Sequence, residues 1–104
     1  MSDSTQLLDV LDLLLKVVPA CRHRRLLHVR SKIAYTAPEL IGLRWCNIHE
    51  ILVELSEADE SASWVEDARK IWNTAYAQRS EQCKVVTDAV LGPRTVDSFP
   101  QTRR

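Results

Sequence analysis

The chain has 104 residues, with 14 basic and 14 acidic side chains and a formal net charge of zero. A chain of this length fits one domain and can bury a core without metals or disulfides. Its three cysteines are far apart and form no CxxC pair, which excludes a disulfide framework and favours a reducing compartment. No apolar run approaches the roughly 20 residues of a membrane span, so we expect a cytoplasmic or nuclear protein that is neither secreted nor membrane-bound.

The composition predicts an all-α fold. There are only two glycines, leucine and alanine are abundant, and long stretches contain no turn dipeptide. We expect a small bundle of four helices, or five if the last helix breaks. Gly92 and Pro93 form a helix stop, because glycine suits the left-handed cap and proline cannot continue the helix. Residues 1–92 are therefore predicted to form a single helical domain, and residues 93–104 a flexible C-terminal tail.

The first predicted helix, residues 4–18, is apolar around most of its circumference. Asp3 or Ser4 can cap it, and its charged residues, Asp9, Asp12 and Lys16, form one narrow stripe. Such a helix must be buried on more than one side, either at the centre of the bundle or against another molecule. Few other elements are available to cover it, so we expect a homodimer. The predicted dimer interface consists of Leu7, Leu11, Leu14 and Val18.

Every charged side chain in the second predicted helix, residues 20–34, is positive. Pro19 precedes this helix and fits its first turn. One side carries an apolar stripe, and the other side is basic at the same helical spacing. The apolar stripe is Leu26, Val29 and Ile33. The basic stripe is Arg25, His28 and Lys32.

The basic side of this helix is the predicted binding site. Arginine pairs phosphate through its planar fork, and duplex RNA is recognised mainly by shape and backbone contacts. We therefore predict a non-catalytic protein that binds a nucleic-acid backbone, double-stranded RNA first. Alternatively the face is solvated, binds an acidic protein, or pairs with this chain's own acidic residues 50–67. The predicted nucleic-acid-binding residues are Arg22, Arg24, Arg25, His28, Arg30 and Lys32.

A third helix is predicted to start within residues 36–39, because Thr36 and Glu39 have capping-box spacing. Its apolar positions alternate in steps of four and three, as packing inside a bundle requires. Gly42 lies within it and costs about 1 kcal/mol of helix propensity, which the close approach of a neighbouring element would explain. The apolar positions are Ile41, Trp45, Ile48, Leu52 and Leu55.

Residues 50–67 contain only acidic charges, and residues 56–62 are the predicted loop. Ser63 and Glu66 form a further capping box. The helix that follows either continues to residue 91 or breaks near Ser80. Its tryptophans are predicted core anchors. The alternative function is a protein-interaction module that docks a partner through residues 4–18 or through the acidic, tryptophan-bearing region 50–72, with Trp64 as the contact.

The sequence contains little that suggests catalysis. Cys46 and His49 have the spacing of half a zinc site, but no second pair of ligands accompanies them. There is no glycine-rich phosphate loop, GxSxG or HExxH motif. We therefore expect no enzyme, no catalytic residue, no metal and no cofactor.

Overall fold

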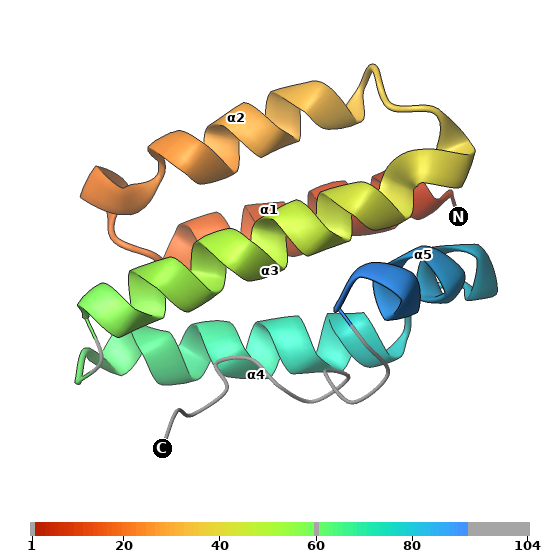
Figure 1. The fold of residues 1–104 in the computed structure, drawn as a ribbon. Helices are drawn as coiled ribbons and strands as arrows, with labels where there is room; N and C mark the ends of the chain where they lie inside the picture. The colour runs from red at the N-terminus through yellow and green to blue at the C-terminus, as the bar shows by residue number, and fades with distance from the viewer. Residues whose placement is uncertain (1, 60, 92–104) are drawn as a thin grey trace.

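The computed structural model describes residues 2–59 and 61–91 (Figure 1). Within these residues it contains helices and no strand, which confirms the all-α prediction. The predicted tail, residues 93–104, lies outside the described residues. The α-helices are α1 (Asp3–Val17), α2 (Arg24–Ile33), α3 (Ile41–Ala58), α4 (Ser63–Ala77) and α5 (Glu81–Leu91), with 3-10 turns at Ala20–Arg22 and Pro38–Leu40.

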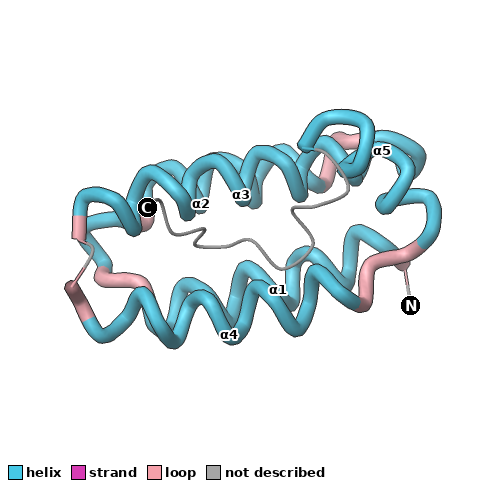
Figure 2. Tube along the Cα trace, turned by 60° about the horizontal axis from the view of Figure 1, so that its bottom comes forward, coloured by secondary structure: helices cyan, strands magenta, loops and turns pink. Residues whose placement is uncertain are grey.

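The helices form two layers. Figure 2 shows α1 and α4 side by side in one layer and α2, α3 and α5 in the other. The long α3 contacts both of its layer neighbours and also α1 beneath it. Helix α2 lies at an edge of the bundle, where it packs on α1 and α3. One side of α2 is therefore held by the core, and the other side faces outward.

The burial of α1 corrects one prediction. All four residues assigned to a dimer interface lie in the core of the single chain, so a second copy cannot contact them. The other helices cover this apolar surface, which removes the reason for assigning it to a dimer. The homodimer itself stays a prediction. The exposed fractions are 0% for Leu7, Leu11 and Leu14 and 3% for Val18.

The helix starts differ from the predicted caps. Ser2 caps α1 by accepting the Thr5 N–H at 3.1 Å, whereas Asp3 and Ser4 lie inside the helix. The Thr36 hydroxyl donates to the Lys32 carbonyl of α2 at 2.7 Å, and Ser63 is the first residue of α4. Neither predicted capping box forms, because local spacing cannot show which backbone group a hydroxyl will meet.

Two element boundaries also differ. After Pro19 the chain makes a 3-10 turn, so α2 starts at Arg24 rather than near residue 20. Helix α3 continues to Ala58 and shortens the predicted loop, and the Ser56 hydroxyl donates to a carbonyl of its own helix at 2.9 Å. The last predicted helix does break near Ser80, where the Ser80 hydroxyl accepts the Cys83 N–H at 3.2 Å and starts α5.

Aromatic residues of α3 and α4 form the centre of the core. Trp45, Trp72 and Tyr76 are all fully buried. The ring centroids of Trp45 and Trp72 lie 5.4 Å apart, and those of Trp72 and Tyr76 lie 5.2 Å apart. Trp64 is also buried, with 8% of its surface exposed, as predicted for a core anchor, and little of its surface is left for the alternative role of partner contact.

Helices α3 and α5 approach each other closely at Gly42. A Cβ atom built on Gly42 would lie 2.5 Å from the Cβ of Val86 and 3.2 Å from the backbone oxygen of Cys83. Only a residue without a side chain fits there. The glycine that weakens α3 locally therefore allows α5 to pack against it.

His49 makes the stability of the bundle depend on pH. Its ring lies 6.0 Å from that of Trp72, and burial lowers its pKa from the ordinary value of 6.5. The unfolded chain then binds a proton more readily than the folded chain, so stability falls as pH drops below about 6.5. We expect His49→Gln to reduce the fall in unfolding free energy between pH 7 and pH 5, measured by urea denaturation.

The exposed His28 supplies the matched control for this experiment. His28→Gln removes a histidine from the exposed side of α2. The same substitution at an exposed position shows whether the change in pH dependence in the His49→Gln protein is specific to the buried site. A pH dependence in the His49→Gln protein equal to that of the natural chain would contradict the role given to burial.

Candidate nucleic-acid interface

The position of α2 follows from its apolar stripe. Leu26, Val29 and Ile33 are buried as predicted and hold the helix on α1 and α3. Because a helix repeats every 3.6 residues, burying one stripe turns the opposite side toward solvent. The basic residues from Arg24 to Lys32 are consequently exposed, and Arg22 is partly exposed in the preceding 3-10 turn.

Three of the six predicted binding residues form ion pairs inside the chain. Two of their partners come from the acidic stretch 50–67 and one comes from α1. Exposed pairs of this kind contribute at most about 1 kcal/mol each. They do, however, reduce the positive charge that α2 presents to a ligand. The pairs are Arg22–Asp59 at 3.0 Å, Arg25–Glu54, and Arg30–Asp12 at 3.1 Å.

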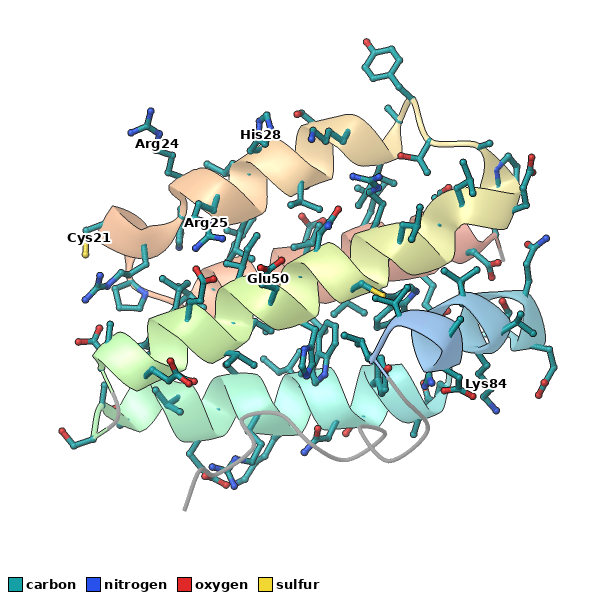
Figure 3. All side chains as sticks on the ribbon, in the orientation of Figure 1. Cys21, Arg24, Arg25, His28, Glu50 and Lys84 are labelled. Carbon is teal, nitrogen blue, oxygen red and sulfur yellow. The ribbon has the colours of Figure 1, made fainter. Side chains whose placement is uncertain are left out.

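The remaining three residues form an outer row along α2. Arg24, His28 and Lys32 follow one another at intervals of four, and none forms an ion pair with a described acidic residue. At 1.5 Å per residue the row spans about 12 Å. In Figure 3, Arg24 and His28 point away from α3, whereas Arg25 points toward it. The structure thus separates one unpaired row from the paired arginines.

An open groove lies between α2 and α3 beside the outer row. Its volume is about 720 Å³. Leu27, Val29 and Ile51 supply apolar surface, and all three residues of the outer row contribute to its lining. Glu50 of α3 also lines the groove and brings a negative charge opposite the row (Figure 3). An anion is therefore favoured on the outer side of α2 rather than deep in the groove.

Cys46 and His49 do not extend into a larger cluster. Burial raises the pKa of the Cys46 thiol to about 11, partly offset by the positive charge of Arg79. The thiol therefore stays protonated at neutral pH, whereas a nucleophile or metal ligand must be a thiolate. Among residues 2–59 and 61–91, no group of three or more His, Cys, Asp or Glu side chains is arranged to hold a metal ion.

Two further residues near the end of α2 could contact a ligand, although they are not among the six predicted binding residues. Tyr35 follows the last turn of the helix with 91% of its surface exposed, and Arg44 lies in the first turns of α3. The sequence could have indicated Tyr35, because this tyrosine lies three positions after Lys32. The sequence offered no signal for Arg44, because it reaches α2 only through the fold.

The charges and contacts of α2 are the basis for inferring a function. None of the described helices has the length and apolar character that a membrane crossing requires. Comparisons with protein families, with curated proteins and with solved structures found no match to this chain.

Proposed function

We propose that this protein binds the phosphate backbone of a nucleic acid through the outer row of α2, and that double-stranded RNA is the first ligand to test. One observation carries the proposal: the outer row is exposed and has no acidic partner among the described residues, although the neighbouring arginines do. A cation that pairs with phosphate releases condensed counterions, and this release drives binding. Cations already paired within the protein contribute less.

The shape of α2 supports a duplex rather than a single strand. The outer row runs for about 12 Å along the exposed side of α2. Helix α2 lies at an edge of the bundle (Figure 1). No aromatic side chain lies between its members, whereas single-strand binding uses aromatic rings on which bases stack. Duplex RNA is recognised largely through backbone and shape. With two to three phosphate contacts, we expect log affinity to change with log salt at a slope of about −2 to −3.

The double variant Arg24→Gln/Lys32→Gln tests the proposal. We expect it to weaken binding of a ~20-base-pair RNA duplex at least tenfold and to reduce the salt slope by about two. The loss should be nearly equal for duplexes of different sequence, because backbone contacts carry no sequence information. Fluorescence anisotropy of a labelled duplex at several salt concentrations measures both quantities.

The matched control also removes two positive charges, but from helices outside the proposed interface. Lys70→Gln/Lys84→Gln takes two positive charges from α4 and α5 and should change duplex affinity less than threefold. An equal loss in both double variants would show that net charge, rather than the outer row, governs binding. No binding by the natural chain at micromolar protein and low salt would overturn the proposal.

The groove between α2 and α3 supports a second candidate function, the binding of an acidic peptide. Its apolar surface and its basic rim would suit a segment with both apolar and acidic side chains. Leu27 distinguishes the two candidates because it is half exposed and carries no charge. Leu27→Ala should weaken a peptide that uses the groove and leave duplex affinity unchanged.

A further inference from the structure

A second basic feature lies where α2 leads into α3. The end of α2 and the following turn lead into the start of α3 there (Figure 1). Residues from these three segments line a hollow of about 360 Å³. We call it the Arg44 hollow. It brings together two cations and three hydroxyl groups, and none of its lining residues is acidic. The lining residues are Ser31, Lys32, Tyr35, Thr36 and Arg44.

No described carboxylate neutralises the two cations of the Arg44 hollow. Neither Lys32 nor Arg44 forms an ion pair with a carboxylate in the described part of the chain. One end of the Arg44 guanidinium donates to the Asn47 side-chain oxygen at 2.7 Å, which orients the group. Its Nε is buried, and no described residue accepts the hydrogen. The bond to Asn47 uses only one of the guanidinium nitrogens, so the group has further N–H donors for a ligand.

Hydrogen bonds to the His28 and Lys32 carbonyls reduce the negative partial charge near the end of α2. The C-terminus of a helix is normally negative, because its last carbonyls have no partner. Here the Ser31 hydroxyl donates to the His28 carbonyl at 2.7 Å. The Thr36 hydroxyl and the Tyr35 N–H both donate to the Lys32 carbonyl, at 2.7 and 3.0 Å.

Tyr35 provides a further donor for a ligand. The Ser31 and Thr36 hydroxyl hydrogens are already used by backbone carbonyls. The Tyr35 side chain, by contrast, is almost fully exposed. Three donors can therefore turn toward the hollow: the Lys32 ammonium, the Arg44 guanidinium and the Tyr35 hydroxyl. Two positive groups with a neutral donor suit a phosphate group, which offers several acceptor oxygens.

We propose that the Arg44 hollow is a phosphate-binding site. Arg44 and Lys32 pair with the phosphate oxygens, and the Tyr35 hydroxyl donates a further hydrogen bond. Lys32 belongs both to the hollow and to the outer row, so the two surfaces are continuous. The source of the phosphate follows from the proposed function, on which this part rests: it is a backbone phosphate of the nucleic acid that lies along α2.

Inorganic phosphate tests the hollow separately from any nucleic acid. We expect the full chain, titrated with phosphate at constant ionic strength, to show saturable amide shifts in ¹H–¹⁵N NMR spectra at Lys32, Tyr35, Thr36 and Arg44. Arg44→Gln should weaken this binding at least fivefold, and Tyr35→Phe should weaken it by less. Lys70→Gln on α4 is the control and should leave it unchanged.

A folding check keeps this test decisive. Arg44 is partly buried, so the circular dichroism spectrum of each variant is compared with that of the natural chain. Arg44→Lys keeps the charge but loses the planar fork, and it should bind phosphate with intermediate affinity. Shifts that do not saturate, or that are equal in the natural chain and the folded Arg44→Gln protein, would overturn the phosphate site.

Binding of the RNA duplex by the Arg44→Gln protein shows whether the hollow takes part in the proposed function. We expect Arg44→Gln to weaken duplex binding three- to tenfold and to reduce the salt slope by about one. Saturable phosphate binding without duplex binding would support the hollow as a site for a small phosphate-bearing ligand and overturn its nucleic-acid source. Duplex binding with affinity and slope unchanged in Arg44→Gln would overturn the hollow's part in that complex.

Discussion

Replacing Trp72 by alanine is expected to lower the free energy of unfolding by about 3–5 kcal/mol. Trp72 is fully buried, and its ring packs against both Trp45 and Tyr76. Alanine would leave a cavity between α3 and α4 and remove both aromatic contacts. Urea denaturation followed by far-ultraviolet circular dichroism measures the loss without relying on tryptophan fluorescence.

Leu13→Ala is the control for this prediction. Leu13 is a large apolar residue on α1, but 48% of its surface is exposed. Its truncation removes little buried area, so we expect a loss well below that of Trp72→Ala. If the two variants were equally destabilised, the aromatic cluster would not be the centre of the core.

Replacing Gly42 by alanine is expected to lower the free energy of unfolding by about 1–3 kcal/mol. In an isolated helix the same change would stabilise α3 by about 1 kcal/mol. In the folded chain the new methyl group would lie 2.5 Å from the Cβ of Val86. That atom is fixed to the backbone of α5, so α5 must move away from α3.

A double-mutant cycle with Val86→Gly tests this cause. Removing the Val86 side chain takes away the atoms nearest to the new methyl group, although the backbone oxygen of Cys83 stays at 3.2 Å. The loss caused by Gly42→Ala should therefore be smaller in the Val86→Gly background than in the natural chain. Stability equal to or above that of the natural chain in the single variant would contradict the close approach.

The charge distribution explains how a chain with zero net charge can present a basic surface. Acidic side chains of α1 and α3 neutralise arginines on the sides of α2 that face these helices. The outer row lies on the exposed side of α2, along the rim of the groove, and has no acidic partner among the described residues. The net charge of zero is therefore compatible with a local excess of positive charge on α2. The proposed interface contains fewer residues than the basic stretch in the sequence.

Periodicity determined what depends on residues close together in the chain. The all-α fold and the buried stripe of α2 follow from apolar spacing, because a helix places residues three and four apart on one side. The break near Ser80 was one of two alternatives left open. The spacing of the capping-box residues was less informative. The Thr36 hydroxyl has backbone acceptors as well as donors within reach, and in the structure it donates to a carbonyl.

Only the tertiary structure decided what depends on residues far apart in the chain. It buried the apolar surface of α1 inside one chain, where the sequence also allowed a second copy. It brought Asp12 to Arg30 and placed Arg44 beside Lys32. The sequence by itself determined that α2 is basic on one side. The packing of α1 and α3 against α2 decided which of those charges remain unpaired, because an ion pair requires the two groups to meet within a few ångströms.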